Sequence, residues 1–262
     1  MTRLIALVIV TLAALATPAL AARSGALRVD GTAFRLKTSS GRLLGSGDLV
    51  GASFEMTGED GASLTVRIDA ANASAEKPYV ELLALSVQDR ATGRWAPMCD
   101  PDITGRRAGF PVAGRWDAHG RFHKDGNSWF LTCTSGAQGK CVLWGYDPWR
   151  PGPHGEDLAP IYEACTHMVR ADYAGKGAPF TRNGTSIDVY DIAGVQTPDS
   201  LGDPAYRFEA GWSPTGAVCV AKTRYADLLP LDVLLQSDPQ LAGPCDEASA
   251  RKRGAVIFNR SR

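Results

Sequence analysis

The stretch that decides the fold is Leu64-Thr-Val-Arg-Ile-Asp69 (LTVRID), in which apolar and polar residues alternate. A period of two places successive side chains on opposite faces of a β-strand, so this segment predicts a strand with one face buried. Turn residues at 58–61 precede it, and the same alternation at Phe54 and Met56 predicts another strand before that turn.

Further strand-like segments fill the first half of the chain. Residues 26–29 and 32–37 flank Asp30-Gly31, a dipeptide typical of a type I′ hairpin turn. Residues 79–88 form a longer and more apolar strand candidate, and 95–99 follow after another turn. So many half-apolar strands bury their faces most simply in a small antiparallel sandwich or barrel. We assign this N-terminal β-rich region to residues 22–109.

The pattern changes after Trp149, where residues 150–157 are rich in glycine and proline. Asp157 can cap a helix over 158–173, with Pro160 in its first turn. The glycines of Gly175-Lys-Gly177 are expected to end that helix. Its apolar residues recur at helical spacing and are expected to be buried: Ile161, Cys165, Met168 and Val169.

The rest of the chain predicts a mixed architecture. We expect a strand at 185–190, a hairpin of 206–212 with 217–223, a shorter helix near 231–236 and a final strand at 255–258. The fold class is therefore α+β, mainly antiparallel β, sandwich- or barrel-like and stabilised by disulfides. Residues 110–262 form the second region, which either packs with the first as one compact unit or folds as a separate module.

The first 21 residues carry an export pattern. Arg3 gives a short positive start, residues 4–16 contain no charge, and Ala19-Leu20-Ala21 is a small-x-small cleavage site. This layout predicts a secretory signal peptide over 1–21, whereas a membrane anchor needs about 20 apolar residues. We expect an exported chain, periplasmic or extracellular, with no membrane span in its mature part.

Export determines how the cysteines are interpreted, because an even number outside the cytosol predicts disulfides. No C-x2-4-C pair is present to indicate a zinc site. Two apolar runs, 128–133 and 141–146, flank the turn-rich segment 134–140, and a hairpin there would join Cys133 to Cys141. Cys219 with Cys245 is the next pair we expect. The six candidates are Cys99, Cys133, Cys141, Cys165, Cys219 and Cys245.

Several short motifs in the second half resemble the bacterial ADYC-domain proteins. They are Cys133-Thr-Ser-Gly-Ala137, Lys140-Cys141, Trp144-Gly-Tyr146, Leu158-Ala-Pro160, Ala164-Cys165, Arg170-Ala-Asp-Tyr173, Gly175-Lys-Gly177, Thr181-Arg-Asn-Gly-Thr185, Ile187-Asp-Val-Tyr-Asp191 and Trp212-Ser-Pro-Thr-Gly-Ala-Val-Cys219. The resemblance covers 110–245, with one departure: the fourth letter of the name-giving motif is Ala174 instead of cysteine. It implies an exported bacterial protein with a cysteine-rich domain, and it implies no catalytic residue.

Charge and motif content argue against several classes of function. The chain has 28 Lys+Arg and 28 Asp+Glu, so a formal net charge of zero gives no field to attract nucleic acid or anionic lipid. The sequence contains neither HExxH nor GxSxG, the signatures of common zinc peptidases and α/β-hydrolases. We expect no nucleic acid partner, no cofactor and no metal.

The polar residues of the predicted 158–173 helix are weak catalytic candidates: His167, Arg170 and Asp172. His167 and Arg170 are three residues apart and share a helix face, whereas Asp172 lies to the side. We favour a solvated helix face as their explanation. Cys165 is a poor thiolate partner for His167, because side chains two residues apart on a helix point in different directions.

Other polar and aromatic groups are weaker still. His119 and His123 lie about 13 Å apart along a strand, too far for one metal. Asp188 and Asp191 point to opposite faces of their predicted strand and make a poor acid–base pair. We assign the six tryptophans to the core instead of a sugar- or peptide-binding groove.

Two hypotheses of function follow. The favoured one is a non-catalytic module that binds a protein, a glycan or another envelope component. The alternative is a secreted hydrolase of unfamiliar type, with a site near the 158–173 helix. A buried histidine with a carboxylate partner in an open pocket favours the enzyme, whereas a shallow aromatic surface favours binding.

Overall fold

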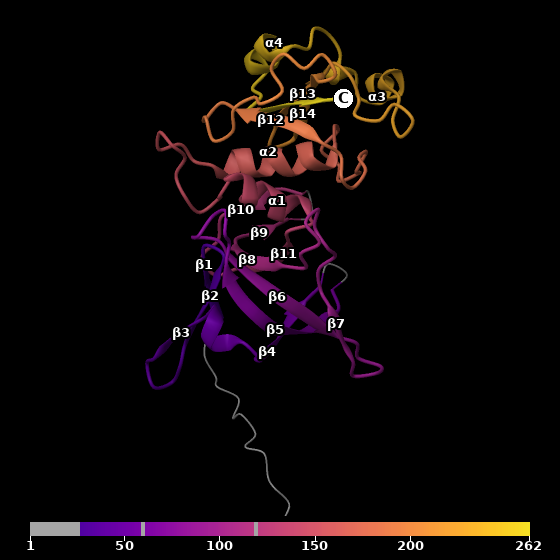
Figure 1. Cartoon of the computed structure of the whole chain (residues 1–262). Coiled ribbons are helices and arrows are strands. Elements are labelled where there is room, and N and C mark those ends of the chain that lie inside the picture. Colours follow the sequence, from indigo (N-terminus) through magenta and orange to yellow (C-terminus); the bar gives the residue numbers. More distant parts are fainter. Residues whose placement is uncertain (1–26, 59–60, 118–119) are drawn as a thin grey trace, which may run out of the picture.

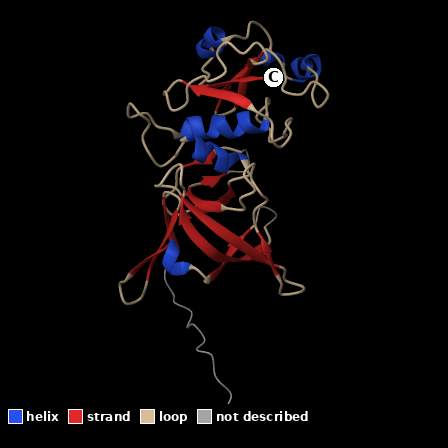
Figure 2. Cartoon of the chain, viewed as in Figure 1, coloured by secondary structure: helices blue, strands red, loops and turns tan. Residues whose placement is uncertain are grey.

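The computed structural model describes residues 27–58, 61–117 and 120–262 (Figure 1). The predicted signal peptide over 1–21 and the candidate His119 lie outside these residues. Within the described residues, no helix has the length and apolar character that crossing a membrane requires. The fold is mainly antiparallel β with a few short helices, as the sequence predicted (Figure 2).

Two antiparallel sheets pack together in the N-terminal part. The smaller has the order β1-β2-β3, and the larger has the order β11-β8-β6-β5-β4, with β7 also paired to β6. These strands are β1 (Leu27–Asp30), β2 (Ala33–Lys37), β3 (Leu43–Gly45), β4 (Ser53–Thr57), β5 (Ser63–Ala73), β6 (Glu81–Gln88), β7 (Trp95–Pro97), β8 (Gly109–Ala113) and β11 (Trp129–Cys133). A short 3-10 helix, η1 (Ser46–Leu49), follows β3.

The alternation in LTVRID sets the orientation of β5 in this sandwich. Val66 and Ile68 are buried, and they pack in one core with Phe34 of the smaller sheet. Arg67 lies on the other face, where its side chain pairs with Asp69. Gly31, at the tip of the β1–β2 hairpin, has a φ of 62°, the left-handed conformation that a type I′ turn requires.

The segment after β11 differs from the prediction. Residues 137–144 form a helix, α1 (Ala137–Trp144), so the hairpin of 128–133 with 141–146 is wrong. A short apolar run does not distinguish a strand from a buried helix, and here the run turned helical. Gly139 permits the tight β11–α1 junction, because a Cβ there would lie 2.1 Å from the Cys133 carbonyl oxygen.

All six cysteines form disulfides, but one predicted pair is wrong. Cys133 bonds to Cys99 and Cys141 bonds to Cys165, because α1 carries Cys141 away from β11 and toward the next helix. The predicted Cys219–Cys245 bond is confirmed, and no cysteine is free.

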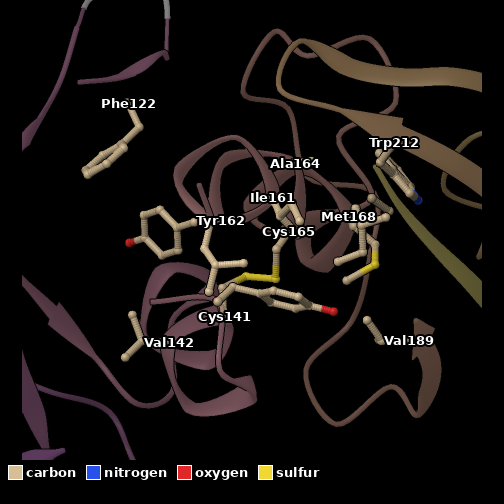
Figure 3. Packing of buried hydrophobic residues seen from close by; sticks show 14 of the residues in the cluster. Phe122, Cys141, Val142, Ile161, Tyr162, Ala164, Cys165, Met168, Val189 and Trp212 are labelled. Atoms are coloured by element: carbon tan, nitrogen blue, oxygen red, sulfur yellow. A yellow bond between two sulfur atoms is a disulfide. The ribbon is translucent and has the colours of Figure 1, made fainter. Parts of the chain in front are cut away.

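Helices α1 and α2 (Ala159–Arg170) form a layer between the N-terminal sandwich and the C-terminal sheet (Figure 1). α2 confirms the main predicted helix in a shorter form. The Cys141–Cys165 bond joins α1 to α2 inside the main core, with Tyr162 toward Phe122 and Met168 toward Trp212 (Figure 3). A two-stranded ribbon, β9 (Arg115–Trp116) and β10 (Phe122–His123), packs against the same helix through Tyr162.

The C-terminal sheet has the order β12-β15-β13-β14. Its strands are β12 (Ile187–Asp191), β13 (Arg207–Ser213), β14 (Gly216–Val220) and β15 (Ile257–Ser261). Neighbouring residues face opposite sides, since Ile257 joins the core beside α2 while Phe258 joins a separate cluster with Ala250. That second face is covered by α4 (Glu247–Lys252). The predicted shorter helix is α3 (Leu231–Ser237), and η2 (Pro239–Leu241) follows it.

Candidate functional site

The candidate residues gather where α2 ends. The helix stops at Ala171, which has a φ of 52°, and the Asp172 amide donates to the His167 carbonyl oxygen. The chain therefore leaves the helix four residues before Gly175, where the sequence had placed the stop. Because Asp172 is no longer helical, its spacing from His167 along a helix does not decide where its side chain points.

His167 and Asp172 form a buried pair. The His167 Nδ1 lies 3.0 Å from Asp172 Oδ2, and the two residues are only 7% and 1% exposed. The predicted solvated helix face is therefore wrong for both of them. Arg170 is half-buried, and its Nη2 donates to the Gly177 carbonyl oxygen.

Asp172 also fixes the loop that follows. Its carboxylate accepts the backbone amides of Lys176 at 3.0 Å and Gly177 at 2.7 Å. Burial alone would raise the pKa of Asp172, but the hydrogen bonds from His167 and these amides lower it below its ordinary value. Asp172 is therefore ionised at neutral pH, and its carboxylate accepts a hydrogen bond from Nδ1 of His167.

Tyr173 of the same motif lies in the core. Its hydroxyl donates to Glu209 Oε1 at 3.0 Å and accepts the Arg224 amide at 2.7 Å. Its ring stacks on Trp212, with the ring centroids 5.2 Å apart. This part of the motif is structural, because it joins the end of α2 to the C-terminal sheet.

A cavity of about 720 Å³ opens beside the His167–Asp172 pair, and we call it the His167 cavity. It lies between the β9–β10 ribbon, the start of α1, the end of α2 and the loop that Asp172 fixes. Two buried polar atoms of lining residues have no hydrogen-bond partner among the described residues: His167 Nε2 and Trp116 Nε1. The lining residues are Trp116, Asp117, Gly120, Gly136, Ala137, Gln138, Thr166, His167, Arg170, Asp172, Gly175, Lys176 and Gly177.

A second cavity of about 690 Å³ adjoins the first and shares Gly136, Ala137 and Arg170 with it. We call it the Lys140 cavity. Burial lowers the pKa of Lys140, which lies half-buried in its wall with Leu143 and Trp144. Both cavities therefore have the N-terminal end of α1 in their walls.

Other candidates from the sequence have structural roles. Asp191 accepts the backbone amide of Ala193 at 2.7 Å, and Asp188 accepts that of Asp199 at 3.0 Å, so each carboxylate fixes the chain that follows its strand. The His123 Nε2 pairs with Asp117 at 2.7 Å. Across 27–58, 61–117 and 120–262, no group of three side chains is arranged to hold a metal ion.

The sequence missed two parts of this site. Trp116 packs against the main core as predicted, but it also lines the His167 cavity, and residues 136–138 of the predicted turn line it too. The family-like run Thr134-Ser-Gly-Ala137 was the available signal, because a Gly-rich turn before a helix often exposes backbone amides to a ligand.

Comparison with known families decides the assignment. The family model of the ADYC domain matches residues 46–226. The chain belongs to the ADYC domain family. The match begins in the N-terminal sandwich and extends beyond β14. Every residue that lines either cavity therefore lies within the matched ADYC domain. Neither the curated proteins nor the solved structures contain a match to this chain.

The departure at Ala174 from the ADYC motif now has a physical account. All six cysteines are paired with one another, so none is left to bond a cysteine at position 174. The other three residues of the motif have separate tasks. Ala171 ends the helix, Asp172 fixes the loop and the histidine, and Tyr173 joins the core.

Proposed function

We propose that this ADYC-domain protein is an exported, non-catalytic binding module whose ligand occupies the adjoining His167 and Lys140 cavities. The observation that carries the proposal is that both cavities have the start of α1 and half-buried Arg170 in their walls. Preformed concave sites with a few polar groups are the usual place for a ligand.

The surroundings of His167 support binding over catalysis. Among the described residues, no serine, threonine or cysteine side chain hydrogen-bonds to its ring, and the neighbouring Thr166 hydroxyl donates to the Glu163 carbonyl oxygen. Asp172 is also engaged by two loop amides, which gives its carboxylate a structural task. A histidine without a held nucleophile can position a ligand group without cleaving it.

The cysteines support export. Three disulfides and no free thiol suit an oxidising compartment, because thiols in the cytosol are kept reduced. The test is the intact mass of protein recovered from the periplasm and the medium, measured without reductant after alkylation. We expect an N-terminus at Ala22 and no alkylated cysteine, whereas an uncleaved chain with alkylated thiols contradicts export.

Binding is tested with a variant that fills the site. Ala137 is the first residue of α1 and lines both cavities, so Ala137→Trp should obstruct them. Ala248→Trp makes the same change at an exposed early position of α4 and serves as the matched control. Purified glycans and peptides of the envelope are tested for binding to the wild type and to both variants. The bound ligand is then recovered, and its mass is measured by mass spectrometry.

We expect an intact ligand that wild type and Ala248→Trp retain and Ala137→Trp loses. Equal retention by all three chains would place the site elsewhere. Recovery of a cleaved ligand would favour the alternative, a hydrolase. The buried His167–Asp172 pair beside an open cavity is the feature that the sequence analysis named as favouring an enzyme, and it supports this alternative because a histidine oriented by a carboxylate is a common general base. In that case His167→Gln should abolish cleavage.

A further inference from the structure

The His167 cavity has an unusual set of unsatisfied polar atoms. Asp172 accepts the hydrogen on Nδ1 of His167, and the neutral tautomer that fits this bond leaves Nε2 as a hydrogen-bond acceptor. Trp116 Nε1 carries a hydrogen and is only a donor. Both atoms are buried, and both lack a partner among the described residues. Buried polar groups normally find a partner, so an acceptor and a donor of this kind indicate a ligand that supplies both.

Positive charge lines the same cavity. Arg170 and Lys176 form no ion pair with any carboxylate among the described residues, although Arg170 has further N–H donors beyond its bond to Gly177. The lining also contains two carboxylates, and each of them is paired with a histidine: Asp172 with His167, and Asp117 with His123. The cavity therefore offers two cationic side chains to an anion.

The start of α1 adds backbone donors. Its N-cap, Gly136, provides no side-chain hydrogen bond, and its first turn contains no acidic residue. The first amides of a helix have no partner within the helix, and they carry the positive end of its dipole. Ala137 and Gln138 present this helix end to the cavity. Together with the unpartnered His167 and Trp116 atoms, this end suits a carboxylate next to hydroxyl groups.

We infer that the His167 cavity binds an acidic sugar residue of the uronate type, whose carboxylate meets the start of α1 and Arg170. A sugar hydroxyl both donates and accepts, so hydroxyls of the same residue satisfy His167 Nε2 and Trp116 Nε1. The inference deepens the proposed function and rests on it, because it names the class of ligand for one of the two cavities.

The test is a titration of the full mature chain, labelled with nitrogen-15, with D-glucuronate at constant ionic strength. D-Glucose provides the hydroxyls without the charge, and acetate provides the charge without the hydroxyls. We expect glucuronate to shift the amide signals of Ala137 and Gln138 with saturation, and to bind about tenfold more tightly than either control.

Variants assign the contacts. Arg170→Gln and Trp116→Phe should each weaken glucuronate binding about fivefold or more, because the first removes the positive charge and the second removes the indole N–H donor. Lys252→Gln, on exposed α4, should leave binding unchanged. His167→Phe tests the acceptor, and the two other variants keep the inference testable if His167→Phe does not fold.

Each other outcome overturns the inference. If glucose binds as tightly as glucuronate, the cavity does not recognise the carboxylate. If acetate binds as tightly, it does not recognise the hydroxyls. If glucuronate shifts other amide signals instead of those of Ala137 and Gln138, the ligand binds elsewhere. No binding by any of the probes also overturns it. The proposed function is judged separately by the Ala137→Trp comparison, so a different ligand in these cavities would leave that proposal standing.

Discussion

Arg224 and Glu209 form an ion pair that is almost completely buried, with side chains 2% and 0% exposed and Arg224 Nη2 lying 3.0 Å from Glu209 Oε1. The same guanidinium donates to the Met168 carbonyl oxygen at 2.7 Å and to that of Val169 at 3.0 Å. Arg224 therefore binds the last carbonyls of α2 and connects them to the C-terminal sheet.

Arg224→Met should destabilise the protein by about 3–5 kcal/mol, since it leaves the Glu209 charge buried without its partner. The measurement is the free energy of unfolding in urea at pH 7. Arg42→Met breaks an exposed pair with Asp48 and should change the stability much less, because that pair is solvated. Equal effects of the two variants would contradict a structural role for the buried pair.

The sequence predicted the sheets better than the site. Alternation in LTVRID located β5 correctly because a strand's period is visible in a few residues. Residues 141–146 were misassigned because a short apolar run suits a strand and a buried helix equally well. The His167–Asp172 pair was missed because it depends on one left-handed residue, Ala171, which helical spacing does not anticipate.

Two disulfides offer a matched comparison. The Cys141–Cys165 and Cys219–Cys245 bonds close loops of similar length, with sequence separations of 24 and 26 residues. Replacing either pair by alanine should cost about 3.5 kcal/mol in the loop-entropy model. Only the first pair holds α1 against α2, so only its loss should weaken ligand binding at the start of α1. Equal loss of binding in both variants would contradict this division.

Asp172 should stabilise the fold in a pH-dependent way. Its pKa is lowered in the folded protein, so its contribution is present above the unfolded value of about 3.9 and is lost as the pH falls through the folded value. Asp172→Asn should therefore be less stable than wild type at pH 7, with a difference that narrows below about pH 4. Urea unfolding between pH 3 and 8 measures this, and a constant difference would contradict it.

Ionised Asp147 should destabilise the folded protein, which is the opposite of the effect of Asp172. Burial raises its pKa despite the Tyr79 hydroxyl and the nearby charges of Lys77 and Arg150, so the ionised form is disfavoured in the folded protein. Asp147→Asn should be more stable than wild type at pH 7, and this gain should vanish as the pH falls below about 3.9. The same urea series measures both aspartate variants, and a loss of stability at pH 7 would contradict the prediction.

A comparison of alanine variants at two glycines in the loop after α2 distinguishes the cost of backbone strain from that of steric conflict. Gly175 and Gly177 both have positive φ, 66° and 84°, so alanine at either position costs about 1–2 kcal/mol for the left-handed conformation. A Cβ at Gly175 would lie 2.0 Å from the Thr215 carbonyl oxygen in the β13–β14 turn, whereas a Cβ at Gly177 would have no atom within 4 Å. Gly175→Ala should therefore be clearly less stable than Gly177→Ala in urea unfolding. Because Gly175 brings the loop against that turn, Gly175→Ala should also displace the Lys176 amide that Asp172 binds, seen as a larger shift of its amide signal. Equal stabilities would show that the contact with Thr215 does not hold the loop in place.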